Sequence, residues 1–265
     1  MNCSNNKLKS ITKAVVPAAG KGTRLMPLTK AVPKELMPLG KKPVLEHIID
    51  EIAEAGITEV LFVISEEKTA IRTHFGESLN GIKFDYVFQD EQKGLADAIY
   101  CAREWVGDEP FTVVLGDSTI ETNQVVSPYT RLIDAYRDTD AACVIAVEEA
   151  PLEEVSRYGI VKPMNGVAPL FQIDGLVEKP TPEAAPSRYA IAGRYAFDPS
   201  IFRYIEQTPT GAKGEYQITD SIGLMLNSGN PIWCVALGDG ETRRDIGTFE
   251  AYFEAFTHEM RKHNS

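Results

Sequence analysis

Apolar segments with two different periods alternate along the first half of the chain. Residues 44–55 carry apolar side chains at helical spacing, follow a proline and stop at a glycine, which predicts a helix. A short run rich in β-branched residues after Lys13 predicts a buried strand instead. The same two patterns continue downstream and predict strands at 60–64, 82–88 and 111–115, a charged helical stretch from residue 66, and a helix at 95–105.

This alternation predicts an α/β fold with a Rossmann-like, doubly wound sheet that is mixed and mostly parallel. Ligands of such sheets bind at the carboxyl ends of the strands. Gly20, Gln89 and Asp117 each lie just past the end of a predicted strand. We therefore expect these three residues at one edge of the sheet, where a ligand would bind.

From residue 141 the pattern changes to strands joined by longer connections that contain prolines. No linker, low-complexity tract or repeat separates the two halves. We therefore expect one domain over residues 1–265, with a first half at about 11–140 and a strand-rich second half at about 141–265. The predicted elements of the second half are strands at 141–147, 159–162, 171–178, 190–197 and 231–236, and helices at 199–206, 218–227 and 248–262.

The turn Gly20-Lys21-Gly22-Thr23-Arg24 follows the first predicted strand. Its glycines let successive backbone N–H groups converge on one point, and its two cations supply full charge. This combination suits a polyphosphate, whereas the ordinary alternative is a solvated turn between a strand and a helix. The turn is not a dinucleotide fingerprint because it lacks the third glycine, and the chain contains no G-x-x-x-x-G-K-[ST] phosphate loop.

The formal net charge of -11 argues against nonspecific nucleic-acid binding and requires any phosphate site to be locally basic. The four cysteines, Cys3, Cys101, Cys143 and Cys234, are widely scattered and favour reduced thiols in a cytosolic protein. Residues 1–9 are too polar for a signal peptide, and no apolar run approaches the roughly twenty residues of a membrane span. These features predict a cytoplasmic protein without nucleic-acid or membrane partners.

The pattern A-A-G-x-G-T-R-L-x-P-x-T-K-x-x-P-K-E-L-x-P begins at Ala18. It resembles the signature of the sugar-1-phosphate nucleotidylyltransferases, which join a nucleoside triphosphate to a sugar 1-phosphate and release pyrophosphate. The resemblance covers the chain from Lys13 to about Tyr252. It implies a nucleotide-binding first half, a sugar-binding second half, a Mg²⁺ cofactor and a homo-oligomer, either dimer or tetramer. Catalysis would come from alignment and charge neutralisation, without a covalent intermediate.

On the nucleotide side, the resemblance implies that Arg24 and Lys34 contact the triphosphate as catalytic cations. Taken alone, Lys34 would be a solvated surface lysine. Gln89 offers a donor and an acceptor to a pyrimidine edge, and Gly94 permits close backbone approach to the base. An exposed loop glutamine is the alternative for Gln89. The other expected nucleotide-binding residues are Ala18, Ala19, Gly20, Gly22 and Thr23.

Two acids resemble the metal-binding carboxylates of this family. Asp117 ends the apolar segment 111–117, and an acid at a sheet edge can hold Mg²⁺ without being buried unpaired. A turn-initiating Asp is an equally good local interpretation. Asp245 lies in the pattern R-x-D-x-G-T, where the resemblance places the second carboxylate. As an isolated residue, an Asp before a helix is usually a cap.

Three segments resemble the family's sugar-phosphate pocket, and the residues that they contribute are Gly159, Glu178, Lys179, Ile191 and Gly193. Glu178 would accept sugar hydroxyls, and Lys179 would meet the phosphate as a catalytic residue. Neighbours in a strand point to opposite faces, so this pair requires a bulge or a strand end, which the following Pro180 favours. A surface ion pair is the alternative.

Within the family, the sequence combines features of two branches. Segments 33–35 and 154–159 resemble the uridylyl branch, whereas segments 94–96 and 115–117 resemble the thymidylyl branch. The connection between residues 74 and 82 is also shorter than the helical insertion of the uridylyl branch. The expected substrates are UTP and glucose 1-phosphate, giving UDP-glucose. The alternative is dTTP, giving dTDP-glucose, and a non-catalytic module that binds nucleotide sugars is a distant third.

Overall fold

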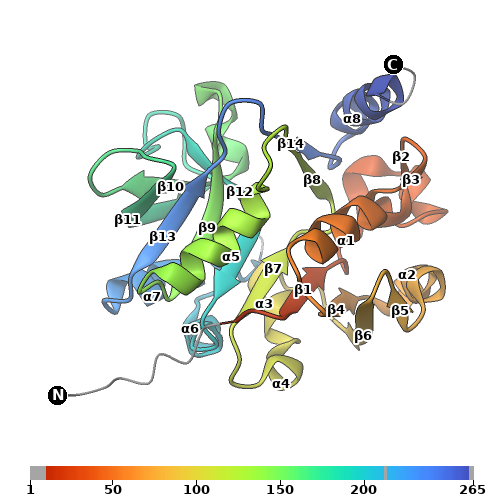
Figure 1. Cartoon of the computed structure of the whole chain (residues 1–265), viewed down its shortest axis with the longest axis horizontal. Coiled ribbons are helices and arrows are strands. Elements are labelled where there is room, and N and C mark those ends of the chain that lie inside the picture. The colour runs from red at the N-terminus through yellow and green to blue at the C-terminus, as the bar shows by residue number, and fades with distance from the viewer. Residues whose placement is uncertain (1–9, 212–213, 263–265) are drawn as a thin grey trace.

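The computed structural model describes residues 10–211 and 214–262. Residues 1–9, including Cys3, lie outside the described part, so the prediction that they form no signal peptide stays a prediction. Among the described helices, none is long and apolar enough to cross a bilayer. Both halves of the chain contribute to one ten-stranded sheet (Figure 1).

The first half builds the parallel part of the sheet. β1 (Lys13–Pro17) pairs in parallel with β4 (Glu59–Ile64) on one side and with β7 (Phe111–Val114) on the other. β4 also pairs in parallel with β6 (Ile82–Phe88), and β5 (Ser78–Leu79) closes this edge as an antiparallel strand. The central strands are rich in Val and Ile because their two faces are both covered, which leaves no row of side chains to face solvent.

The second half extends the sheet with β9 (Cys143–Glu149), β10 (Gly159–Pro163), β11 (Leu170–Glu178), β12 (Tyr189–Phe197) and β13 (Ile232–Ala236). The strand order is β10-β11-β13-β9-β12-β7-β1-β4-β6-β5. β12 lies antiparallel between β7 and β9 and so joins the two halves. β5, β11 and β12 run against the other seven strands. The predicted mixed, mostly parallel sheet is confirmed.

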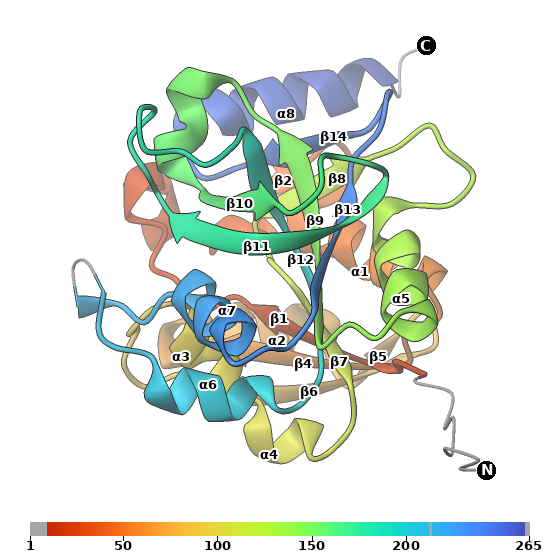
Figure 2. The same cartoon turned by 90° about the vertical axis from the view of Figure 1, so that its left-hand side faces the viewer.

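Helices cover the sheet from both sides (Figures 1 and 2). Alternate residues of β1 enter two different cores, because Val16 packs in one cluster and Val15 in the other. The Val16 cluster contains residues of α1 (Val44–Glu54), α2 (Thr69–Phe75), α5 (Pro128–Asp138) and α8 (Phe249–Lys262). The Val15 cluster contains residues of α3 (Leu95–Tyr100), α4 (Arg103–Val106), α6 (Ile201–Gln207) and α7 (Ile218–Asn227).

Shorter elements connect these layers. The charged stretch predicted from residue 66 is a 3₁₀ turn that leads into α2. The 3₁₀ turns are η1 (Thr23–Leu25), η2 (Leu28–Lys30), η3 (Lys34–Leu36), η4 (Glu66–Lys68) and η5 (Leu152–Arg157). Two further ladders pair β2 (Pro38–Leu39) with β3 (Lys42–Pro43) and β8 (Ser118–Glu121) with β14 (Thr242–Asp245).

The helix predicted at 95–105 is wrong as a single element, because the structure has α3 and α4 there. Ala102 N–H donates to the Ile99 carbonyl at 3.0 Å, a three-residue step that tightens the turn and interrupts the α-helical ladder. Helix α5 was not predicted at all. Its signal is Ser127-Pro128, since Ser127 Oγ accepts from Thr130 N–H at 3.1 Å and proline suits the first helical position.

Glu121 holds α8 against the β8–β14 ladder. Its carboxylate accepts from Arg244 (2.9 Å), His258 (2.8 Å) and Lys262 (2.7 Å). Burial alone would raise the pKa of Glu121, but the hydrogen bonds from Lys262, His258 and Arg244 lower it to about 2. The charged form is therefore favoured in the folded protein, and three segments distant in sequence are joined at one side chain.

We expect Glu121→Gln to reduce the free energy of unfolding at neutral pH, with a loss that shrinks as the pH falls. The folded-state pKa is depressed below the ordinary 4.5, so the stabilisation is present above about pH 4.5 and is lost toward about pH 2. Urea unfolding of wild type and variant between about pH 6 and about pH 3 measures this difference, with the exposed Glu104→Gln as control. A difference that does not change with pH would contradict the role of the ionised carboxylate.

Candidate active site

Three loops leave the same edge of the parallel strands, as the strand pattern predicted. β1, β6 and β7 run in parallel with their common neighbours and end just before Ala18, Gln89 and Leu115. Ala18 N–H donates to the Val63 carbonyl at 2.8 Å, and Gln89 N–H donates to the Ile64 carbonyl at 2.9 Å. The loops that follow β1 and β6 therefore both start against the carboxyl end of β4.

A cavity of about 210 Å³ opens between the two halves of the chain. Arg24 and Asp117 line it from the first half, and Asp245, the second acid predicted to bind metal, lines it from the second half. All the residues predicted for the sugar phosphate line it as well. The predicted residues at this cavity are Arg24, Asp117, Gly159, Glu178, Lys179, Ile191, Gly193 and Asp245.

A short antiparallel ladder brings Asp117 and Asp245 together. In the β8–β14 pair, Ser118 lies opposite Asp245. Ile246 N–H donates to the Asp117 carbonyl at 3.1 Å, which joins the ends of the two segments. Because the carboxyl end of β7 leads directly into β8, an acid from the middle of the chain meets one from near its end.

Lys34 lies beside this acid pair, with its Nζ 2.5 Å from Asp117 Oδ2 and its side chain only 15% exposed. Burial alone would lower the pKa of Lys34, but Asp117, Glu35 and Asp245 raise it on balance. Burial would likewise raise the pKa of Asp117, but Lys34 outweighs burial and lowers it. Lys34 is therefore a half-buried cation beside an ionised acid, which differs from the solvated surface lysine of the alternative interpretation.

The strand end expected at the Glu178-Lys179 pair is present. β11 ends at Glu178, and Lys179 has a φ of 47°, in the left-handed region. Lys179 N–H donates to the Tyr158 carbonyl at 2.9 Å. The two side chains line one cavity and are also ion-paired, with Lys179 Nζ 2.6 Å from Glu178 Oε1. Neighbouring side chains in a regular strand would point to opposite faces of the sheet. The left-handed backbone at Lys179 lets both side chains reach the same cavity.

Close packing fixes the other carboxylate oxygen of Glu178. Thr219 Oγ1 donates to Glu178 Oε2 at 2.7 Å. A Cβ at Gly159 would lie 2.8 Å from Thr219 Oγ1 and 2.9 Å from Ile191 Cδ1, so only glycine fits without displacing them. Three predicted sugar-side positions therefore depend on one another through direct contact.

Of the two residues predicted to bind the base, Gln89 lines a different cavity, of about 570 Å³, together with Lys21, whereas Gly94 does not line it. Gln89 is 4% exposed, and its Nε2 donates to Asp97 Oδ2 at 2.6 Å, so the exposed loop glutamine of the alternative is wrong. Gly94 has a φ of 108°, and a Cβ there would lie 2.5 Å from the Tyr216 carbonyl oxygen. The Gly94 backbone is thereby packed against the second half of the chain.

The glycine-rich loop contributes one cation to each cavity, Lys21 to the larger and Arg24 to the smaller. Gly22 adopts a left-handed φ of 63° directly before η1, and its carbonyl accepts from Thr29 Oγ1 at 3.0 Å. Thr23 is exposed next to Arg24, and a Cβ at Gly20 would meet no heavy atom within 4 Å. The loop is thus open around Gly20, where the sequence predicted phosphate binding.

A buried ion pair that sequence reasoning missed supports the start of this loop. Lys68 Nζ donates to Glu35 Oε2 at 2.7 Å and to the Ala18 carbonyl at 2.8 Å. Burial raises the pKa of Glu35 and lowers that of Lys68, although each attracts the other. Gln92 Nε2 donates to the Ala19 carbonyl at 3.0 Å. Both alanines are 2% exposed, so they shape the loop through their backbone.

A second missed pair lies beneath the cavity. Arg194 is fully buried in β12 and donates to Glu51 Oε2 at 2.7 Å and Oε1 at 3.0 Å. It also donates to the carbonyls of Ser118 (2.9 Å) and Gly193 (3.2 Å). An arginine inside an apolar run signals a buried charge that needs a partner, but the sequence alone does not identify that partner.

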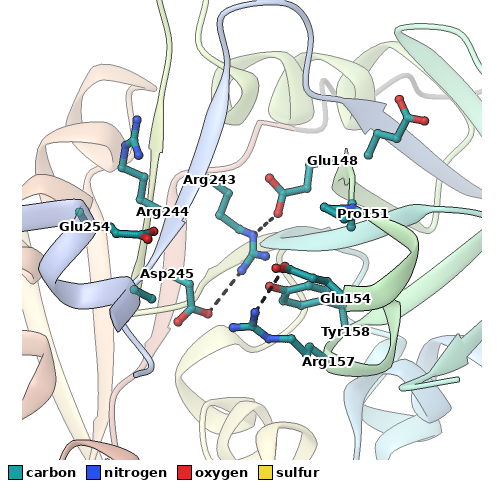
Figure 3. A pocket seen from close by; sticks show the side chains of 13 residues that line it. Glu148, Pro151, Glu154, Arg157, Tyr158, Arg243, Arg244, Asp245 and Glu254 are labelled. Atoms are coloured by element: carbon teal, nitrogen blue, oxygen red, sulfur yellow. Dashed lines mark hydrogen bonds and ion pairs between the residues drawn. The ribbon is translucent and has the colours of Figure 1, made fainter. Parts of the chain in front are cut away.

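A third cavity, of about 280 Å³, adjoins the first and shares Arg157, Tyr158, Arg243 and Asp245 with it. Arg243 lies between two carboxylates (Figure 3). Its Nε is 2.5 Å from Glu148 Oε1, and its Nη1 is 3.5 Å from Asp245 Oδ2. The Arg243 guanidinium carbon also lies 4.5 Å from the centre of the Tyr158 ring. Arg243 therefore connects the wall of this cavity to the Asp245 carboxylate.

Residues 13–262 match the nucleotidyl transferase family, and the chain belongs to this family. It is 40% identical to the UTP–glucose-1-phosphate uridylyltransferase of Bacillus subtilis, over 91% of this chain and 88% of that protein. The enzyme of the same name from Mycoplasma pneumoniae is 39% identical, over 94% and 92% of the two chains.

Solved structures agree with this assignment. A UDP-glucose pyrophosphorylase complexed with UDP-glucose superimposes with a TM-score of 0.89 at 32% identity, covering 96% of this chain and all of that one. A putative glucose-1-phosphate thymidylyltransferase from Bacillus anthracis gives a TM-score of 0.80 at 25% identity, covering 94% and 95%. The mixed α/β nucleotidyltransferase fold expected from the sequence is confirmed.

Proposed function

We propose that this protein transfers a uridylyl group from UTP to glucose 1-phosphate, forming UDP-glucose and pyrophosphate. The observation that carries the proposal is a cavity of an acidic protein lined by two cations and two acids, with a third cation, Lys34, paired to one of these acids. Arg24, Lys34 and Lys179 supply the positive charge, and Asp117 and Asp245 supply the carboxylates. Names of relatives at about 40% identity support the choice of substrates.

The sugar phosphate occupies the 210 Å³ cavity in this proposal. Glu178 accepts sugar hydroxyls, and its carboxylate is already oriented by Thr219. Lys179 meets the phosphate, for which its ammonium exchanges its present contact with Glu178. Gly159, Ile191 and Gly193 shape the wall of the cavity around the sugar.

The triphosphate follows the glycine-rich loop from the larger cavity to the smaller one. Backbone N–H groups of the loop and the charges of Arg24 and Lys34 neutralise it. Gln89 and Gly94 contact the base. The loop residues assigned to the nucleotide are Ala18, Ala19, Gly20, Gly22 and Thr23.

We assign Mg²⁺ to Asp117 and Asp245. Carboxylate oxygens are the ligands that Mg²⁺ prefers, and it commonly uses one or two carboxylates together with substrate phosphates. Within residues 10–211 and 214–262 no cluster of three or more His, Cys, Asp or Glu side chains is placed to hold a metal, so phosphates would complete the shell. The Ser118 hydroxyl, next to Asp117, lacks a hydrogen-bond partner although it is buried, which also favours a ligand here.

The reaction is an in-line displacement. A phosphate oxygen of glucose 1-phosphate forms a bond to the α-phosphorus of UTP, and the bond to the β-phosphate bridging oxygen breaks. Pyrophosphate leaves with the electron pair, and Arg24 and Lys34 stabilise its charge. The bound metal would supply further charge neutralisation. The attacking oxygen is already anionic, so the protein needs neither a nucleophile of its own nor a general base.

The thymidylyl alternative retains one structural argument. Residues between α2 and β6 contain only the two-residue strand β5, in place of the longer insertion expected of the uridylyl branch. Uracil and thymine differ by one methyl group, which changes binding by only about 1–3 kcal/mol. A non-catalytic module is disfavoured because the three cations and two acids are all present.

We further propose a cytoplasmic homo-oligomer, either dimer or tetramer. Cys101, Cys143 and Cys234 are free thiols, as is usual in a reducing compartment. Phe249 and Phe253 on α8 are 39% and 69% exposed, and exposed apolar side chains favour contact with another copy of the chain.

Pyrophosphate release should be fastest with UTP and glucose 1-phosphate, with dTTP a measurable second nucleotide. Purine triphosphates should be much poorer, because ring size and edge pattern both change and would leave Gln89 unpaired. The assay crosses UTP, dTTP, ATP and GTP with several sugar 1-phosphates and compares kcat/KM. A dTTP preference above about tenfold would move the protein to the thymidylyl alternative, and a purine preference would overturn the assignment of the base.

Asp117→Asn should lower kcat by more than about tenfold at saturating Mg²⁺ while the protein stays folded. The substitution removes a ligand charge and also the partner of Lys34. Circular dichroism and thermal unfolding establish folding, and the exposed Asp108→Asn provides a control of equal charge change. Retention of more than about a tenth of the wild-type kcat would exclude Asp117 as a metal ligand.

A further inference from the structure

The side-chain amide of Gln89 is held by two acceptors. Its Nε2 lies 2.6 Å from Asp97 Oδ2 and 3.4 Å from the Gly94 carbonyl oxygen. A carboxylate and a carbonyl oxygen can only accept hydrogen bonds, so both contacts require the nitrogen of the amide and exclude its oxygen. The orientation of the amide thus follows from its hydrogen-bond partners.

This orientation leaves Gln89 Oε1 on the other side. Among the described residues no donor is hydrogen-bonded to Gln89 Oε1. Ser118 Oγ is the only described side-chain atom that is both buried and unpaired, so Gln89 Oε1 is unpaired because it is accessible. Gln89 itself lines the 570 Å³ cavity beside Lys21. The amide therefore offers an acceptor, and not a donor, to a ligand in this cavity.

The backbone that carries Asp97 is fixed at the start of its helix. Asp97 lies in the first turn of α3, which directly follows the N-cap residue Gly94. Ala96 N–H donates to the Tyr216 carbonyl at 3.1 Å, and Tyr216 N–H donates to the Lys93 carbonyl at 2.6 Å. These hydrogen bonds on both sides of Gly94 fix the backbone at the start of α3, and with it the position from which the Asp97 side chain reaches Gln89.

We propose that Asp97 is a positioning residue that fixes Gln89 as an acceptor, and that it thereby selects bases with an N3–H group over cytosine. Uracil and thymine carry a donor at N3, which Gln89 Oε1 can accept. Cytosine has a lone pair at N3, so two acceptors would face each other and Oε1 would be left unpaired. This proposal rests on the proposed function, and it adds the residue that sets discrimination between UTP and CTP.

The test is the ratio of kcat/KM for UTP to kcat/KM for CTP in wild type and in Asp97→Asn. Asparagine has the same shape but can present either a donor or an acceptor, which lets the Gln89 amide turn over. We expect this ratio to fall by at least about tenfold in the variant, with part of the change appearing as improved use of CTP. Asp108→Asn, exposed on another segment, controls for the loss of one charge and should keep the wild-type ratio.

Equal losses of kcat/KM for both nucleotides, with an unchanged ratio, would overturn the proposal and leave Asp97 with a purely structural role. Calorimetric binding of UTP and CTP provides the same ratio without turnover, should the variant be too slow to assay. Gln89→Met sets the baseline, because it removes the acceptor and should abolish most discrimination between the two bases. A wild-type protein that uses no pyrimidine triphosphate would overturn the proposed function itself, which is a different outcome from an unchanged ratio.

Discussion

The fully buried Arg194 is the constraint on which the rest of the site depends. It lies in β12, the antiparallel strand between the two halves, where its charge can be satisfied only by other parts of the chain. Glu51 of α1 neutralises it, and the carbonyls of Gly193 and Ser118 take its remaining donors. One side chain therefore connects a helix of the first half, the strand that follows Asp117 and the sugar-side wall. Removal of one partner from such a pair typically costs about 3–5 kcal/mol.

The charged side chains around the cavity lie on or beside the segments that Arg194 connects. The protein carries a formal net charge of -11, yet three cations are directed at one site. Lys34 and Asp117 are held 2.5 Å apart, and each shifts the pKa of the other toward the charged form. The acid is thus ionised and available to a metal, and the cation is available to phosphate. In the proposed function, polyanionic substrates take the place of the carboxylates that now pair with Lys34 and Lys179.

Local sequence patterns predicted much of the fold because strands and helices here have strong periodicity. The buried strand after Lys13 and the strand end at Lys179 were both expected from residue order. The pairs Glu35–Lys68 and Arg194–Glu51 could not be predicted, because each joins residues far apart in sequence and many partners were available. Asp97 was missed for a related reason, since its role depends on the side chain that it orients.

The central claim is that each half of the chain binds one substrate at a shared cavity. Arg24 and Lys179 test it most directly, because they line the same cavity from different halves. Steady-state kinetics of Lys179→Ala should show a KM for glucose 1-phosphate that rises about tenfold or more, with a far smaller change in KM for UTP. Arg24→Ala should instead impair the use of UTP. If both variants gave the same kinetic signature, the division of the substrates between the two halves would be contradicted.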